Sequence, residues 1–253
     1  MLAVVAFGGA LLTFFSGFGL GTVLLPAFAL FFPPGAAVAA TAVVHLATNV
    51  FKWGLVRQAV EWPVARQFAL AAIPAALCGA WLLGWLSLQT PWYSWTVAGH
   101  TASVTPLKGA VGGLVVAFAL LELIPPRQLP RFESVHLAWG GLLSGFFGGL
   151  SGHQGALRSL FLLRVGLPPA SFVATGVAIA VAVDLSRLLI YGGQLRALSL
   201  DAHATPVGVA IAGAFAGAWL GSRWLHKVTI QWLQRIVATL LVVYGGALAA
   251  GLI

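Results

Sequence analysis

Residues 1–32 read MLAVVAFGGALLTFFSGFGLGTVLLPAFALFF, an apolar run longer than the roughly 20 residues that one membrane-spanning helix needs. Glycine interrupts the run between Ser16 and Gly21, and each glycine weakens a helix by about 1 kcal/mol relative to alanine. The run therefore predicts two half-helices that meet at a break. The alternative is a single helix whose glycines let a neighbouring helix pack closely.

The composition of the whole chain is that of an integral membrane protein. Hydrophobic residues make up 60% of the 253 residues and charged residues only 7%, whereas a soluble domain carries about 25% charged residues. This composition excludes most soluble enzymes, nucleic-acid-binding proteins and disordered chains. Cys78 is the single cysteine, so no internal disulfide can form. Residues 1–15 lack a basic region, and we expect no cleaved signal peptide.

Further apolar runs follow with mostly short connections, which predicts an all-α membrane protein of about eight hydrophobic segments. The side chains are apolar at consecutive positions, which is unlike the alternation of β-barrel strands. The fifth run is also long and is broken by the sequence Ser151-Gly152-His153-Gln154-Gly155. The predicted runs are residues 1–32, 36–56, 64–88, 107–124, 136–163, 170–191, 203–222 and 231–252.

Two halves of the chain, residues 1–106 and 107–253, align as an internal repeat. At an offset of 135 residues, polar and proline positions fall into one register that chance does not readily produce. The matching pairs are Ser16-Gly17 with Ser151-Gly152, Pro33-Pro34 with Pro168-Pro169, Asn49 with Asp184, and Lys52 with Arg187. Further on, at an offset of 138, Gly79-Ala80-Trp81-Leu82 matches Gly217-Ala218-Trp219-Leu220.

The distribution of positive charge separates a parallel from an inverted repeat. Ten of the thirteen Lys and Arg residues lie outside the helix interiors. If every run crosses the membrane once, the halves are parallel and the ten divide equally between the two sides. If the two Gly-broken runs, 1–32 and 136–163, instead enter and return, the halves are inverted and only Lys108 and Arg196 lie opposite the other eight. Because positive residues gather on the cytoplasmic side, we predict inverted repeats with re-entrant first segments and an external N-terminus.

Ionisable residues within the apolar runs are the candidates for a functional site, because each costs about 2.5–3.5 kcal/mol at the centre of a membrane helix. The second run carries a polar stripe within an arc of about 100° of the helix. The stripe predicts a face lining a water-filled path, or alternatively a face that bonds to a neighbouring helix. Its residues are Thr41, His45, Thr48, Asn49 and Lys52.

The second half carries the matching charges. Asp184 and Arg187 are three residues apart and can pair on one helix face, either as a structural ion pair or with Arg187 holding an anion and Asp184 carrying a proton. A half-helix that starts near Gly155 would direct backbone N–H groups at the break, and Arg158 would add a full positive charge. His153 could titrate near neutral pH there, or it could be a packed histidine.

The sequence contains little that indicates a catalytic, nucleotide-binding or metal-binding site. No nucleophile motif, phosphate-binding loop or dinucleotide fingerprint is present, and the histidines do not have metal-ligand spacing. We therefore expect no cofactor, no metal and no enzyme activity. Small hydroxyls at the breaks, Ser16 and Ser151, could donate to a ligand or could be small residues at helix crossings.

The Gly-rich segment Ser16–Gly21, followed by Leu24-Leu25-Pro26 and Pro33-Pro34, resembles the start of the TauE/SafE sulfite exporter family. Residues 151–176 resemble that family's second half. The resemblance implies a multi-pass inner-membrane protein that exports sulfite or a related sulfur-containing or organic anion. The second break is more polar than the family pattern, at His153, Gln154 and Arg158, which leaves the identity of the anion open.

Together these features predict a secondary transporter for a small sulfur oxyanion, most simply sulfite, that works in the lipid bilayer and binds no nucleic acid. The alternatives are a transporter or channel for thiosulfate or a sulfonate, an intramembrane enzyme, or a scaffold. We expect Asp184 or His153 to couple protons. The expected substrate-binding residues are Lys52, Arg187, Arg158, Asn49, His153, Ser16, Ser151 and His45.

Overall fold

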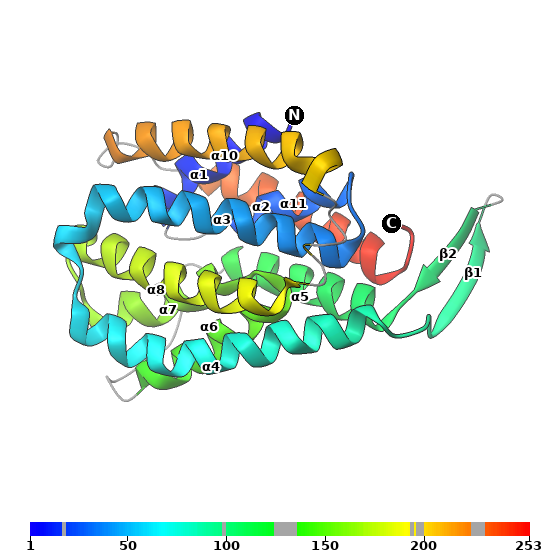
Figure 1. The fold of residues 1–253 in the computed structure, drawn as a ribbon, viewed down its shortest axis with the longest axis horizontal. Coiled ribbons are helices and arrows are strands. Elements are labelled where there is room, and N and C mark those ends of the chain that lie inside the picture. The colour runs from blue at the N-terminus through cyan, green and yellow to red at the C-terminus, as the bar shows by residue number, and fades with distance from the viewer. Residues whose placement is uncertain (17–18, 98–99, 124–135, 193–194, 196–199, 224–230) are drawn as a thin grey trace.

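A computed structural model describes the chain except residues 17–18, 98–99, 124–135, 193–194, 196–199 and 224–230. Most of the chain is helical, and a β-hairpin projects from one end (Figure 1). The helices are α1 (Leu2–Ser16), α2 (Leu20–Ala29), α3 (Pro34–Val56), α4 (Trp62–Ser87), α5 (Pro106–Leu123), α6 (Leu137–Ser151), α7 (Gln154–Val165), α8 (Pro169–Ile190), α10 (Leu200–Arg223) and α11 (Gln231–Ala249). A 3₁₀ turn, η1 (Arg57–Ala59), follows α3.

Within the described residues, four segments are long and apolar enough to cross a membrane. They are Pro34–Ala59, Trp62–Ser87, Pro169–Ile190 and Ala204–Arg223, which correspond to α3 with η1, α4, α8 and most of α10. Proline at the first turn of α3 and α8 fits these helix starts, because an N-terminal residue needs no N–H donor.

The two long apolar runs are each broken at the predicted glycines. The first run divides into α1 and α2, and the second into α6 and α7. Gly19 has a φ of 122° and Gly152 a φ of 84°, in the region that glycine adopts without strain. At about 1.5 Å per residue, each of these four helices is shorter than the roughly 30 Å hydrocarbon core of a bilayer. None of the four could therefore cross it alone.

The chain folds back at both breaks. The Thr13 hydroxyl donates to the Gly9 carbonyl at 2.6 Å and accepts from the Leu20 N–H at 3.1 Å, which ties the start of α2 to α1. At the second break, the Ser144 hydroxyl donates to the Gln154 carbonyl at 2.9 Å. On one straight helix these two residues would be about 15 Å apart along the axis. Each pair of short helices is thus bent back on itself.

Helices α3 and α8 lie side by side in opposite directions. Pro33–Ala36 at the start of α3 and Ile190 at the end of α8 line the same groove, near the hairpin. At the other end, the Glu61 N–H after η1 donates to the Thr175 hydroxyl early in α8 at 3.0 Å. We call these two ends of the molecule the hairpin end and the loop end.

The remaining helices pack in pairs that correspond between the halves. Helix α6 packs on α4 and α1 packs on α10, while α5 packs on α11. Glycines allow the close approach, because the space that a Cβ at Gly79 would need holds the Phe146 carbonyl oxygen. In the same way, a Cβ at Gly217 would overlap the Phe7 carbonyl oxygen.

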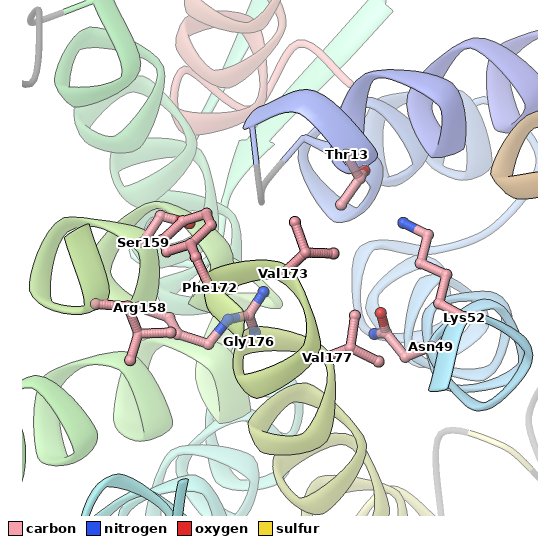
Figure 2. Close-up of a pocket in the computed structure, with 10 residues that line it drawn as sticks. Thr13, Asn49, Lys52, Arg158, Ser159, Phe172, Val173, Gly176 and Val177 are labelled. Carbon is pink, nitrogen blue, oxygen red and sulfur yellow. The ribbon is translucent and has the colours of Figure 1, made fainter. Parts of the chain in front are cut away.

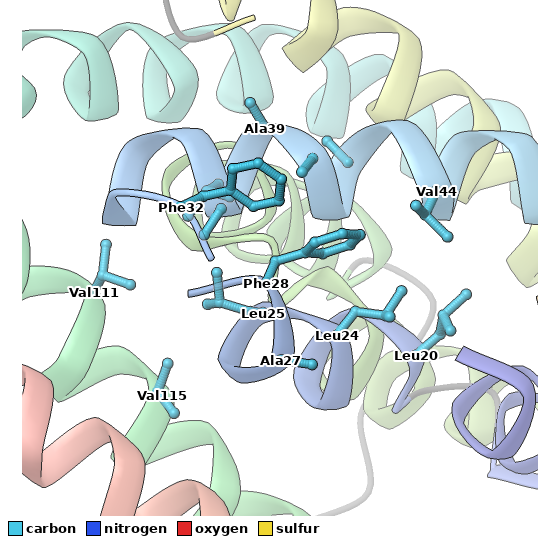
Figure 3. Close-up of a cluster of buried hydrophobic side chains, with 14 of the residues drawn as sticks. Leu20, Leu24, Leu25, Ala27, Phe28, Phe32, Ala39, Val44, Val111 and Val115 are labelled. Carbon is cyan, nitrogen blue, oxygen red and sulfur yellow. The ribbon is translucent and has the colours of Figure 1, made fainter. Parts of the chain in front are cut away.

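A large apolar cluster seals the interior between α2 and α3. Leu20, Leu24, Leu25 and Phe28 of α2 face the alanine-rich first half of α3, and Val111 and Val115 of α5 belong to the same cluster (Figure 3). All of these side chains are buried. The small alanine side chains of α3 bring the two helices close together.

The β-hairpin was not expected from the sequence. Strands β1 (Tyr93–Val97) and β2 (His100–Val104) pair antiparallel, in the segment between the predicted runs 64–88 and 107–124. Tyr93, Trp95 and Val97 alternate with Ser94 and Thr96, a period of two that the search for long apolar runs passes over. The Trp95 indole N–H donates to the Ala250 carbonyl at 3.1 Å, which ties the hairpin to the end of the chain.

Candidate functional site

Asp184 lies at the centre of a buried hydrogen-bond network that joins α3, α7 and α8. Its Oδ1 accepts from Arg187 Nε at 3.0 Å, from Arg187 Nη2 at 2.7 Å and from Gln154 Nε2 at 2.8 Å. Its Oδ2 contacts His45 Nδ1 at 2.7 Å and accepts from Asn49 Nδ2 at 3.1 Å. The predicted pairing of Asp184 with Arg187 on one helix face is confirmed.

The same network holds the second helix break in place. Arg187 Nη1 donates to the Gly148 carbonyl at 3.2 Å, and the Tyr191 hydroxyl donates to the Gly149 carbonyl. These carbonyls belong to the last turn of α6, where the Gly148 carbonyl also accepts from the Gly152 N–H at 3.0 Å. Arg187 and Tyr191 therefore attach α8 to the end of α6, and Arg187 at the same time pairs with Asp184.

A small cavity lies next to this network, on its loop-end side. Its volume is about 20 Å³, which is room for about one water molecule. Lys52 of α3 and Arg158 of α7 reach the cavity from opposite sides, with Asn49 beside Lys52 (Figure 2). The remaining lining residues are Thr13, Ser159, Leu162, Phe172, Val173, Gly176 and Val177.

Gln154 connects the cavity to Asp184. Its amide N–H donates to Asp184, and its carbonyl oxygen accepts from Arg158 Nη1 at 3.2 Å. It is also the first residue of α7, where the N-terminal end of a helix carries a partial positive charge. The Arg158 guanidinium is thus oriented by a residue that itself sits at a site favourable for anions.

Buried positive charge exceeds buried negative charge around the cavity. In the described part of the chain, the buried Lys, Arg, Asp and Glu residues are Lys52, Arg158, Arg187 and Asp184. The single carboxylate is paired with Arg187, while Lys52 and Arg158 line the cavity. An anion placed between Lys52 and Arg158 would interact favourably with both side chains.

Six predicted site residues meet in this network and cavity: His45, Asn49, Lys52, Arg158, Asp184 and Arg187. Two others make their side-chain contacts outside it. His153 Nδ1 contacts the Ser151 hydroxyl at 3.1 Å, and its ring stacks on Phe118 of α5 at 5.5 Å. Ser151 also donates to the Phe147 carbonyl. The side chain of Ser16 lies outside the described residues.

Sequence reasoning missed Gln154 and Thr13. Gln154 carried a usable signal, because its counterpart at the offset of 135 is Gly19, so the second half has a polar side chain where the first half has none. Thr13 carried no such signal. It stands alone in an apolar run, and its role in the cavity wall depends on the bend between α1 and α2.

Comparison with known proteins identifies the family. The model of the family described as "Sulfite exporter TauE/SafE" matches residues 1–248. No curated protein and no solved structure matches the chain. Members of the matched family are membrane transporters, in agreement with the membrane-spanning helices of the structure. Because the match covers nearly the whole length, the chain belongs to the TauE/SafE sulfite exporter family.

Proposed function

We propose that this protein is a secondary transporter that exports a small sulfur oxyanion, with sulfite as the first candidate, across the cytoplasmic (inner) membrane. One observation carries the proposal: Lys52 and Arg158, from different halves of the chain, line the same cavity. An oxyanion presents several oxygens to such donors, and a guanidinium can give it two parallel hydrogen bonds. Thiosulfate or a sulfonate would satisfy the same charges and is the second candidate.

The size of the cavity bears on the mechanism. A volume of about 20 Å³ accommodates about one water molecule, so the helices must move apart before an oxyanion can enter. We propose alternating access, in which a site between two halves opens first to one side and then to the other. Broken helices next to the cavity support this mechanism, since transporters commonly build their sites at such breaks.

We propose that the two halves are inverted repeats. Shifting α1 (Leu2–Ser16) by 135 residues gives the bounds of α6 (Leu137–Ser151), and α3 shifted likewise gives those of α8 to within one residue. The antiparallel contact of α3 and α8 joins Asn49 to Asp184, which are themselves counterparts at this offset. Helix α5 packs on α11, the last helix of the second repeat. We therefore propose that α5 is the last helix of the first repeat. The boundary between the repeats then lies within residues 124–135 and not between residues 106 and 107, where the sequence placed it.

The orientation follows from the same positive charges. In the described structure, Arg57, Arg66 and Arg164 belong to helix ends at the loop end, while Lys108 lines the groove at the hairpin end. Positive residues gather on the cytoplasmic side. We therefore propose a cytoplasmic loop end and an external hairpin end. Ala3 packs on Gly213 and Phe7 packs on Gly217, so α1 runs parallel to α10. Both helices then start at the hairpin end, which puts the N-terminus on the external side in this proposal.

We further propose that Asp184, together with His45, couples proton movement to transport. Asp184 contacts Asn49, which lines the cavity, and is therefore one residue away from a bound anion. His153, the other candidate for this role, faces Phe118 and Ser151 instead.

Sulfite flux in proteoliposomes that contain only this protein tests the proposal. We expect flux in vesicles with the protein and none without it, and an imposed pH gradient should accelerate it. If folded protein gives no sulfite flux, thiosulfate and small sulfonates are tested in the same vesicles. Absence of flux for all three would refute the proposed function.

A further inference from the structure

The residues that correspond to the cavity wall in the other repeat lie on the opposite side of the Asn49–Asp184 contact. In the part of the chain that the structure describes, they belong to a region packed with apolar side chains instead. Cavity residues Val173, Gly176 and Val177 of α8 correspond, at the offset of 135, to Val38, Thr41 and Ala42 of α3. Val38 and Ala42 belong to the apolar cluster that also contains Leu24 and Phe28 of α2. The region around Thr41 is therefore sealed where its counterpart is hollow.

Helix α2 supplies that seal, and apolar side chains stand on it where the other half has polar ones. Leu24, a member of the cluster, is the counterpart of Ser159, which lines the cavity in the other half. The half-buried Val23 next to Leu24 is the counterpart of Arg158, which also lines that cavity. Leu24 and Phe28 are fully buried in the cluster. The hairpin-end side of the network is thus closed by α2, while the loop-end side keeps its cavity.

Thr41 is anomalous within this seal. Its side chain is 2% exposed, and its hydroxyl oxygen has no hydrogen-bond partner among the described residues. A buried hydroxyl without a partner is costly, and a threonine inside a helix can usually donate to the carbonyl four residues earlier. Thr48 on the same helix does so, donating to the Val44 carbonyl at 2.7 Å.

Thr41 also lies on the face of α3 that carries the cavity cation. At about 100° per residue, Thr41 and Lys52 are within about 20° of each other around the helix. They are separated by about 16 Å along the axis, with the Asn49–Asp184 contact between them. The two residues therefore lie on one path, on opposite sides of the central network.

The packing of the two broken helices shows a matching asymmetry. Gly79 of α4 faces the Phe146 carbonyl, whereas its counterpart Gly217 of α10 faces that of Phe7. The counterpart of Phe146 at the offset of 135 is Leu11, four residues beyond Phe7. Helix α1 is thus about one helical turn further along α10 than α6 is along α4, and one-turn displacements are a known kind of switching movement.

We infer that the Thr41 hydroxyl is a second anion-binding group, which contacts the transported oxyanion when the seal formed by α2 opens toward the hairpin end. This inference rests on the proposed transport of an oxyanion. In the closed arrangement the hydroxyl has no partner, and the oxyanion supplies one when it passes. Thr41 thereby extends the site from the Lys52–Arg158 cavity to the opposite side of the network.

The first test compares two threonine substitutions that remove the same atom from the same helix. Thr41→Val should lower sulfite flux about tenfold while leaving the melting temperature unchanged or raised, because a hydroxyl without a partner is removed. Thr48→Val, whose hydroxyl bonds only to its own backbone, should keep wild-type flux. Equal flux for the two variants, with wild-type protein active, would overturn the inference.

The second test does not depend on which anion is transported. A cysteine at Thr41, with Cys78 replaced by alanine, is exposed to a membrane-impermeant maleimide from the hairpin side of sealed vesicles. We expect labelling from that side, and no labelling of a cysteine at buried Ala119 of α5. No labelling at Thr41 would refute the opening, even if sulfite flux is normal. Labelling without flux of any tested anion would instead refute the proposed function and retain the opening.

Discussion

The ion pair of Asp184 and Arg187 should be required for folding as well as for function. Both side chains are completely buried, and Arg187 gives Asp184 two hydrogen bonds, at 2.7 and 3.0 Å. Arg187→Gln removes the guanidinium that pairs with the carboxylate and leaves His45 as the one ionisable side chain that the described residues place in contact with it. Breaking a buried pair in this way costs about 3–5 kcal/mol. For a protein of this length, that free energy corresponds to a loss of about 6–20 °C in melting temperature.

Asp184→Asn should be destabilising for a related reason. The carboxylate accepts hydrogen bonds at both oxygens, from Gln154 and Arg187 at one and from Asn49 at the other. An asparagine side chain must place its NH₂ group against one of these donors, and it leaves Arg187 without a counter-charge. The double variant Asp184→Asn/Arg187→Gln removes both charges, so it should lose less stability than the sum of the single variants.

Melting temperatures of the three purified variants in detergent, followed by tryptophan fluorescence, measure these effects. We expect both single variants to melt clearly below wild type and the double variant to recover about 0.5–3 kcal/mol relative to additivity. Single variants that melt within about 2 °C of wild type, a shift that corresponds to no more than about 1 kcal/mol, would show that the pair does not hold the helices together.

Three further predictions concern helix packing, proton coupling and topology. Gly79→Ala should lower stability by about 1–3 kcal/mol in a thermal melt, because its Cβ would overlap the Phe146 carbonyl, whereas Gly113→Ala, at an open position, should not; equal melting temperatures would contradict the packing. Asp184→Asn should abolish the acceleration of sulfite flux by a pH gradient, measured below its melting temperature, and His153→Gln should keep it; the reverse result would move the proton-coupling role to His153. An epitope tag at the N-terminus should be accessible to antibody in intact spheroplasts, and a tag reached only after permeabilisation would refute the external N-terminus.

Most of the helices could be predicted from the sequence because an apolar run of fixed length is a strong signal. The predicted run 36–56 became α3 (Pro34–Val56), and the run 170–191 became α8 (Pro169–Ile190). Both glycine-rich breaks also appeared where they were expected, since positive φ values at Gly19 and Gly152 are open to glycine at little cost. Periodicity and backbone preference are local properties, and a single sequence contains them.

Side-chain contacts between different helices could not be predicted in the same way, because they depend on how the chain folds back at the breaks. The pairing of Asp184 with Arg187 was predicted correctly, because residues three positions apart on one helix lie on the same face. The contact of Asn49 with Asp184, in contrast, depends on how α3 meets α8. Gln154 and Thr13 reach the site only because the chain turns at the two breaks. The stacking of His153 on Phe118 likewise depends on the position of α5.

The central claim is that the cations of the small cavity bind the transported anion, and sulfite flux by Arg158→Gln tests it most directly. Arg158 lines the cavity, and its loss leaves the Asp184–Arg187 pair intact. Arg66→Gln on the exposed surface of α4 removes the same charge away from the cavity and serves as the control. We predict that Arg158→Gln, folded and inserted like wild type, loses most of its sulfite flux in proteoliposomes while Arg66→Gln retains it. Equal flux in the two variants would contradict the account.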